Sequence, residues 1–138
     1  FMVMIILNII LHYVFPVKKV INSPYNYLGI LLIISGIYFN LWVNFVYKRK
    51  KTTMKPDEVP RVLVTSGIFK ISRNPVYLGM ALILLGESIL LGSIITFLFP
   101  LLFIIATNIW VIPIEEKNLE KKSGKKYLDY KKKVRKWL

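Results

Sequence analysis

The basic residues of the chain fall into three separate clusters, and the apolar blocks between them limit what the chain can fold into. Two lie at Lys18 and Lys19, eight between Lys48 and Arg73, and ten between Lys117 and Lys136. None lies between Asn74 and Glu116, and 55% of all residues are hydrophobic. Apolar blocks of membrane-spanning length that alternate with basic loops are typical of integral membrane proteins. The sequence therefore predicts an all-α integral membrane protein.

The net charge of +13 is also compatible with nucleic-acid binding. Basic residues that flank apolar spans are, however, what the positive-inside rule predicts, so we expect membrane lipids as partners and no nucleic acid. The chain has no cysteine and one histidine. These counts exclude disulfides and thiolate metal sites and argue against a Ser-His-Asp triad, so we expect no metal.

We expect one membrane domain, residues 1–138, with about four transmembrane helices. Pro16 and Pro113 are expected to end helices, and Pro100 to kink one. The expected spans are residues 1–15, 25–47, 75–91 and 94–112, with a polar loop at 48–73 and short amphipathic helices at 114–138. Within the last segment, residues 125–138 read as a basic helix that either lies flat on the membrane or covers a site.

The distribution of charge predicts the topology. The central loop and the tail together carry eighteen of the basic residues, whereas the loop at 16–24 carries two. The positive-inside rule therefore predicts that the central loop and the tail lie in the cytosol. With an even number of spans, both termini are then cytosolic, and the protein is multi-pass.

The second span carries a small or polar stripe at helical spacing. Gly29, Gly36, Asn40, Asn44 and Tyr47 recur at steps of three, four or seven. The stripe is either a close helix-packing face or, at Asn40 and Asn44, the wall of a substrate groove.

The start of the third span combines residue types suited to anion binding. Asn74 and Pro75 fit the N-cap and first helical positions, and a helix N-terminus offers free N–H groups. Arg73 adds a planar cation, Tyr77 a ring, and Gly79 room for close approach.

Two acids follow the fourth span. The third and fourth spans are joined by a two-residue turn, so they are predicted to form a C-terminal helical hairpin of roughly 26–28 Å. The start of one span is then level with the end of the other, which brings Glu115 and Glu116 near Tyr77. A site with a cation and carboxylates suits a zwitterionic ligand.

Several ordered blocks resemble the isoprenylcysteine carboxyl methyltransferase and phospholipid methyltransferase superfamily of membrane enzymes. Residues 64–79, with Arg73-Asn74-Pro75-Val76-Tyr77-Leu78-Gly79, are similar to its R-H-P-x-Y-x-G block. Glu115-Glu116 begins an E-E-x-x-L block, and residues 124–137 resemble its G-x-x-Y-x-x-Y-x-x-x-V-x-R-W block. The family pattern often has His where Asn74 stands, and Arg where Lys136 stands.

The resemblance implies S-adenosylmethionine as the methyl donor and S-adenosylhomocysteine as the product. It implies three catalytic residues, Glu116, Glu115 and Arg135. The implied cofactor-binding residues are Arg73, Asn74, Pro75, Tyr77, Gly79, Glu115, Glu116, Tyr127 and Tyr130.

The implied function is methyl transfer to a lipophilic acceptor at the cytosolic membrane face. A prenylcysteine carboxylate is the leading acceptor, and a phospholipid amine is the alternative. Asn40, Asn44 and Glu87 are candidate substrate contacts, since an acid within a span is often functional. Glu87 is also open to pairing with His12, or to service as the coupling acid of a small four-span proton-coupled transporter. The sequence assigns no oligomeric state.

Overall fold

A computed structural model describes residues 1–15, 18–50 and 63–138. Within these ranges the secondary structure is helical, with no β-strand and one isolated bridge between Lys19 and Ser93. Pro16 and residues 51–62 of the predicted central loop lie outside the described residues. The chain divides into two compact units, which are described separately below. The first unit comprises Phe1–Tyr38 and Gly79–Ile105, and the second comprises Phe39–Leu78 and Ala106–Leu138.

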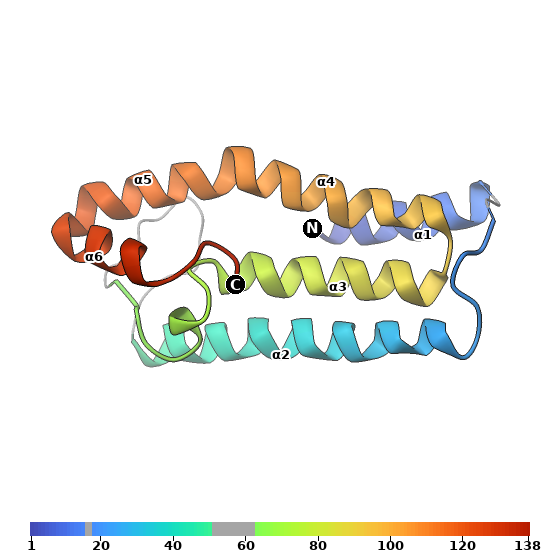
Figure 1. Cartoon of the computed structure of the whole chain (residues 1–138), viewed down its shortest axis with the longest axis horizontal. Coiled ribbons are helices and arrows are strands. Elements are labelled where there is room, and N and C mark those ends of the chain that lie inside the picture. Colours follow the sequence, from blue (N-terminus) through green and yellow to red (C-terminus); the bar gives the residue numbers. More distant parts are fainter. Residues whose placement is uncertain (16–17, 51–62) are drawn as a thin grey trace. The chain divides into compact units, whose positions relative to one another are not determined.

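Within the described residues, six α-helices follow one another along the chain, with short 3-10 or π segments between some of them (Figure 1). The α-helices are α1 (Met2–Val14), α2 (Leu28–Arg49), α3 (Pro75–Leu91), α4 (Leu98–Ala106), α5 (Ile112–Ser123) and α6 (Lys125–Lys133). The 3-10 segments are η1 (Tyr25–Tyr27), η2 (Gly67–Lys70) and η3 (Ile94–Phe97), and η4 (Thr107–Val111) is a π-helix. The helix expected at 75–91 has these bounds in the structure.

In the first unit, α2 and α3 approach closely at two pairs of glycines. A Cβ on Gly29 would clash with the backbone carbonyl of Gly86 and lie 2.8 Å from the backbone nitrogen of Leu90. A Cβ on Gly36 would clash with the carbonyl of Gly79. The glycine part of the predicted stripe is therefore a helix-packing face, as small residues on apolar helices often are.

A buried polar cluster joins α1 to the end of α3 in the first unit. The Asn8 side chain is fully buried and donates to Glu87 Oε2 at 3.2 Å and to Ser88 Oγ at 3.3 Å. His12 Nδ1 instead contacts Ser93 Oγ at 2.7 Å. The expected pairing of Glu87 with His12 is therefore wrong. Asn8 and Glu87 come together because their apolar helices leave each with no water to bind.

Pro113 does not end a helix, contrary to the sequence expectation. The chain is helical from Ile94 to Ser123, and the π-helix η4 ends at Val111, two residues before Pro113. A proline lacks an N–H donor, and its ring crowds the preceding turn. A wider π turn at that point relieves the crowding, so the helix continues. Pro100 lies in the first turn of α4, and the departure from α geometry occurs at η4 instead.

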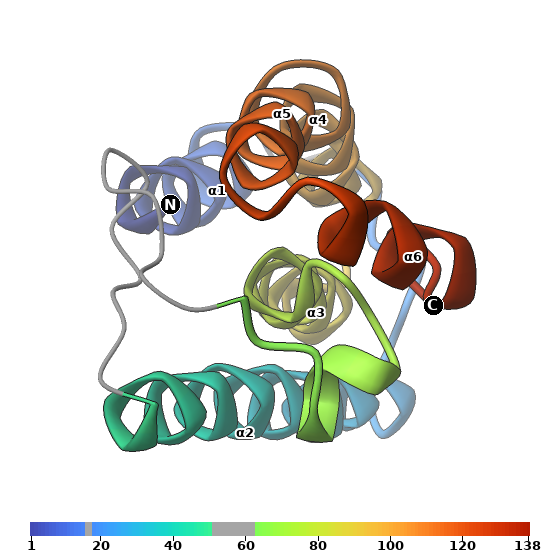
Figure 2. The ribbon, with the colours of Figure 1, turned by 90° about the vertical axis from the view of Figure 1, so that its left-hand side faces the viewer.

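The core of the second unit lies under α6. It consists of buried side chains from α2, from the segment around η2 and from α6: Val43, Val64, Ile68, Phe69, Tyr127 and Tyr130. Figures 1 and 2 show α6 beside this segment. The apolar face of α6 is thus used inside the protein, and α6 covers other residues rather than burying that face in a membrane. The expected helix also stops at Lys133, after which Val134 is extended.

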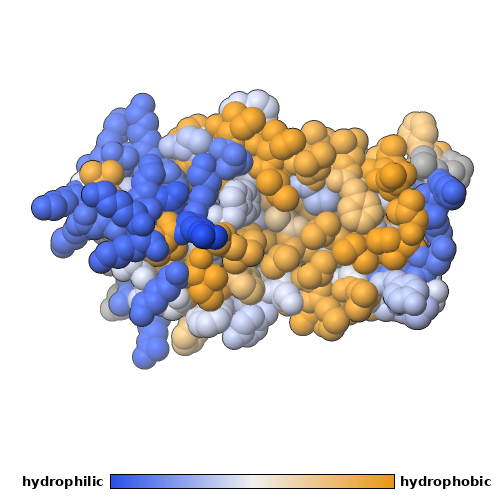
Figure 3. Space-filling model, viewed as in Figure 1, coloured by the Kyte–Doolittle hydropathy of each residue, from blue (hydrophilic) through white to orange (hydrophobic). Residues whose placement is uncertain are grey.

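Two helical stretches are long and apolar enough to cross a membrane, Tyr25–Arg49 and Ile94–Ser123. Only 17% and 22% of their most apolar windows are buried. A core helix of a soluble protein would hide most of such a surface, so the exposed apolar faces indicate a membrane environment. The helices α1 and α3 are apolar but shorter. In Figure 3 the surface over α4 is hydrophobic, whereas the surface over α6 is hydrophilic.

Candidate functional site

The start of α3 is fixed by the segment before it. The carbonyl of Asn74 accepts the first helical hydrogen bond, from Leu78 N at 3.0 Å. Asn74 N donates to Ser72 Oγ at 3.1 Å, and Pro75 is fully buried at the first helical position. The side chain of Asn74 does not bond to the helix. Its amide donates to the carbonyl of Lys136 at 3.0 Å and so reaches the C-terminal tail.

Arg73 and Glu116 form a buried ion pair at the centre of the second unit. Arg73 Nη2 lies 3.0 Å from Glu116 Oε1, and the two side chains are only 9% and 10% exposed. Lys131 Nζ lies 3.1 Å from Glu116 Oε2 but is 39% exposed. One carboxylate is therefore neutralised by two cations, one buried and one at the surface.

Glu115 has a different environment from its neighbour. Its Oε1 accepts a hydrogen bond of 2.5 Å from Tyr77 Oη. Among the described residues, Glu115 has no cationic partner within ion-pair distance. The start of α3 therefore lies near the acids of α5, as expected. The Tyr77 hydroxyl contacts Glu115, whereas two cations contact Glu116.

Two tyrosines of α6 close the second unit over this pair. Tyr127 is 1% exposed, and Tyr130 Oη donates to the carbonyl of Phe69 at 2.6 Å. Burial raises the pKa of Tyr127, with Glu116 adding to the rise and Arg73 opposing it. Burial also raises the pKa of Tyr130, again with Arg73 in opposition. Both tyrosines are consequently neutral hydrogen-bonding groups at physiological pH.

The extended tail is tied to the segment before α3. Arg73 N donates to the carbonyl of Arg135 at 3.0 Å, and Arg73 Nη1 donates to the carbonyl of Lys131 at 3.3 Å. Ser72 Oγ donates to the carbonyl of Lys136 at 3.3 Å, which also accepts from Asn74. We refer to these contacts of residues 72–74 with residues 131–136 as the tail clamp. The tail clamp explains why α6 ends at Lys133. An extended chain after that residue leaves its backbone carbonyls available to accept hydrogen bonds from residues 72–74.

The structure brings together most of the predicted site residues but not all of them. Arg73, Asn74, Pro75, Tyr77, Glu115, Glu116, Tyr127 and Tyr130 all belong to the second unit. Gly79 and Glu87 belong to the first unit, where Gly79 packs against Gly36. Asn40 and Asn44 are half-buried on α2. Arg135 is exposed and contributes its backbone carbonyl to the tail clamp.

Three residues of this arrangement were missed by sequence reasoning. Lys131 neutralises Glu116, while Ser72 and Lys136 take part in the tail clamp. A signal for Lys131 existed, because it follows Tyr127 by four residues and so shares its helix face. No local sequence pattern predicts a hydrogen bond to the backbone carbonyl of Lys136.

Two buried polar atoms of this site lack a hydrogen-bond partner, and they partly suit a zwitterionic cofactor. Arg73 Nε and Glu116 Oε1 are buried without a hydrogen-bond partner, although the ion pair holds Oε1 close to Arg73. Buried polar atoms normally have partners, so an unsatisfied donor and acceptor mark a place where a ligand gains by binding. Arg73 and Glu116 fit a ligand that carries both an ammonium and a carboxylate.

Comparison with known proteins adds an independent finding. A family model described as phospholipid methyltransferase matches residues 24–126, which is more than half of the chain and includes Arg73, Tyr77, Glu115 and Glu116. An uncharacterized protein of Haemophilus influenzae is 44% identical over 62 residues, which cover 45% of this chain and 98% of that protein. No solved structure matches the chain.

Proposed function

Because the chain belongs to the phospholipid methyltransferase family, we propose that it transfers a methyl group from S-adenosylmethionine to a lipophilic acceptor at the cytosolic face of a membrane. Membership of this family implies methyl transfer at a membrane. The observation that most supports a site in this chain is the pair Glu115 and Glu116, two neighbouring acids held in different ways by Tyr77 and by Arg73 with Lys131.

S-Adenosylmethionine supplies an electrophilic methyl group on a sulfonium and leaves as S-adenosylhomocysteine. The residues of the chain then have to position the reactants and exclude water. Arg73, Asn74, Pro75, Tyr77, Glu115, Glu116, Tyr127 and Tyr130 are proposed to surround the cofactor. Gly79 is proposed to serve it indirectly, through the packing that holds α3.

The two acids are suited to different tasks. Glu116 is paired with both nearby cations, so we assign it to the binding and orientation of the cofactor. Among the residues that the structure describes, Glu115 has a hydroxyl partner and no cation within ion-pair distance, so its charge remains available to an ammonium or a proton. A general base needs this freedom.

The same difference favours one class of acceptor. A carboxylate acceptor such as a prenylcysteine needs a cation to position it, and Glu116 already engages Arg73 and Lys131. The exposed Arg135 is then a candidate for that role. An amine acceptor needs a proton acceptor, and Glu115 supplies one. We therefore propose an amine-bearing lipid as the acceptor, with a prenylated carboxylate as the competing substrate.

The test uses the purified full chain in nanodiscs with methyl-labelled S-adenosylmethionine. One arm supplies phosphatidylethanolamine, and the other supplies a prenylcysteine analogue. We expect label in the amine lipid, and a loss of roughly 100-fold or more in rate for Glu115→Gln, the effect of losing a general base. Glu120→Gln on the same helix is the matched control and is expected to keep the rate.

The outcomes separate the parts of the proposal. Label in the prenylcysteine arm alone overturns the amine acceptor but keeps the methyltransferase. Absence of any heat on titration with S-adenosylmethionine, together with no label in either arm, overturns the enzyme. Dye efflux driven by a proton gradient and abolished by Glu87→Gln would instead support a transporter.

A further inference from the structure

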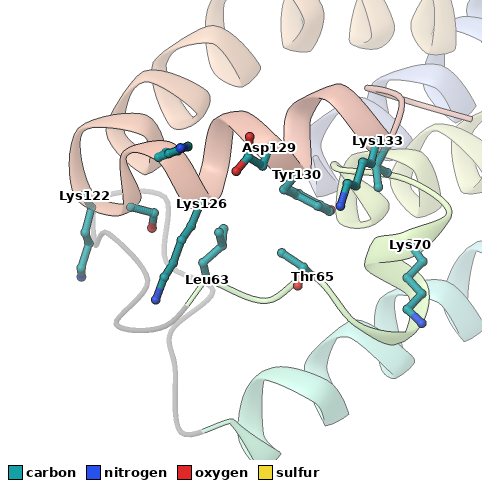
Figure 4. Close-up of a pocket in the computed structure, with 11 residues that line it drawn as sticks. Leu63, Thr65, Lys70, Lys122, Lys126, Asp129, Tyr130 and Lys133 are labelled. Atoms are coloured by element: carbon teal, nitrogen blue, oxygen red, sulfur yellow. The ribbon is translucent and has the colours of Figure 1, made fainter.

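The second unit contains a cavity on the side of α6 that carries most of its lysines. The cavity has a volume of about 1110 Å³ and lies between the segment 63–70 and residues 122–134 (Figure 4). It contains none of the acids proposed to serve methyl transfer, and of the proposed cofactor residues only Tyr130 reaches it. The lining residues are Leu63, Thr65, Lys70, Lys122, Ser123, Lys125, Lys126, Asp129, Tyr130, Lys133 and Val134.

The charge of the lining is strongly one-sided. The lining contains five lysines and one aspartate, Asp129. Within the described parts of the chain, no salt bridge joins Lys126 or Lys133 to an acid. Cations gathered around one cavity repel one another, and an anion bound among them removes that repulsion. The cavity is therefore suited to a ligand with at least one negative charge.

The lining also has an apolar part that a small inorganic anion would not use. Tyr130 is buried, and Leu63 and Val134 are half-buried, whereas the five lysines are all exposed. In Figure 4 the Lys126 side chain extends from α6 toward the segment that carries Leu63 and Thr65. A cationic rim around an apolar floor matches an amphiphile with a charged head.

We propose that this cavity binds the phosphate head group of an anionic membrane lipid. Lysine ammonium groups bind phosphate as point charges without requiring a fixed geometry, which suits a rim of flexible side chains. The first carbons of the acyl chains contact Leu63, Tyr130 and Val134. The bound lipid bridges the segment 63–70 and α6.

The experiment titrates the full chain, in a neutral detergent, with phosphatidylglycerol, and counts bound lipid by native mass spectrometry. The test variant is Lys126→Gln combined with Lys133→Gln. The control variant is Lys117→Gln combined with Lys121→Gln, which removes the same charge from exposed positions of α5 outside the cavity. We expect the test variant to bind roughly 10- to 30-fold more weakly, from the loss of two lysines near an anionic lipid, and the control to bind as the natural chain does.

Each other result overturns the proposal. Equal weakening in both variants would show non-specific attraction to net charge. Binding of glycerol 3-phosphate as tight as that of the lipid would show a site for a soluble phosphate, and displacement of the lipid by short duplex DNA would show a nucleic-acid site. Calorimetry with S-adenosylmethionine on the same variants is expected to give unchanged affinity, which separates this site from the proposed methyl transfer.

Discussion

Burial determines how much each ion pair of Glu116 contributes to the stability of the protein. Arg73 and Lys131 lie at nearly equal distances from the carboxylate, but the Arg73 side chain is 9% exposed and that of Lys131 is 39% exposed. Removing one partner of a buried pair leaves a charge without water or a counter-ion. A pair at the surface is replaced by water at little cost.

We therefore expect Arg73→Gln to destabilise the protein by about 3–5 kcal/mol. Lys131→Gln, which removes the other cation of the same acid, is expected to cost about 0.2–1 kcal/mol. Thermal unfolding of both variants in one detergent measures the difference. Equal losses would mean that distance, and not burial, determines the contribution of each pair.

Tyr77 is expected to act through a single hydroxyl. Tyr77→Phe keeps the ring but removes the donor to Glu115 Oε1. A hydrogen bond to a charged group contributes about 1.5–3 kcal/mol to stability, so we expect the melting temperature to fall and, because the same bond positions the proposed base, methyl transfer to fall roughly 10- to 100-fold. Tyr25→Phe, at a tyrosine that is 70% exposed, is the control for loss of a hydroxyl. An unchanged rate in Tyr77→Phe would remove Tyr77 from the site.

Asn74 can be understood from its partner in the tail. The family pattern often has histidine at this position, and both side chains can donate an N–H group to the carbonyl of Lys136. Asn74 departs from the family pattern but therefore keeps a hydrogen-bond donor at this position. What the position requires is a donor of suitable length.

This reasoning predicts that Asn74→His keeps most of the activity, whereas Asn74→Leu loses the bond and leaves a carbonyl of the tail clamp with one donor fewer. The expected cost for Asn74→Leu is about 1–3 kcal/mol. Limited proteolysis that monitors cleavage after residue 133 measures release of the tail. A tail equally protected in both variants would show that the clamp does not depend on this side chain.

The helices α2 and α3 depend on glycine for their approach. A Cβ on Gly36 would meet Ile83 Cγ1 at 2.7 Å as well as the backbone of Gly79. The neighbouring backbone cannot move aside as a flexible side chain would.

We expect Gly36→Ala to destabilise the protein by about 1–3 kcal/mol, the usual cost of overpacking. Ser35→Ala, one position earlier and exposed, loses only a bond to the carbonyl of Leu31 in its own helix and is expected to have little effect. Thermal unfolding in detergent compares the two variants. A tolerated alanine at position 36 would show that the helices can separate without loss.

The helix α6 illustrates how one pattern permits two outcomes. Its apolar stripe predicts either a helix that lies on a membrane or one that covers a site, and Tyr127 and Tyr130 are equally suited to both. Their burial over Val43, Ile68 and Phe69 shows that the stripe packs inside the protein, and that α6 covers a site stays a prediction. The remaining faces of α6 carry lysines, which leaves the charged side of the helix available to an anionic lipid.

The orientation of the whole molecule in a membrane stays a prediction that the charge distribution makes. Because the chain contains no cysteine, single cysteines can report it without background. We expect Lys126→Cys to react with a membrane-impermeant maleimide only from the cytosolic side, and Lys18→Cys only from the opposite side. Labelling of both positions from one side would refute the predicted topology.

The sequence by itself determined the features that depend on neighbours along the chain. Hydrophobic blocks and basic loops indicated apolar helices, Asn74-Pro75 marked the start of α3, and the ordered blocks led to the correct family, which the family match confirms. The glycine stripe on α2 was also recognisable, because spacing along a helix defines its faces.

The tertiary structure alone decided which groups meet across the chain. In the folded chain Arg73 and Lys131 both contact Glu116, and the Tyr77 hydroxyl donates a hydrogen bond to Glu115. The tertiary structure also turned the last residues into an extended clamp. Such contacts depend on where a few carbonyl and carboxylate oxygens lie in space, to within an ångström or so, and residue spacing carries no information at that precision.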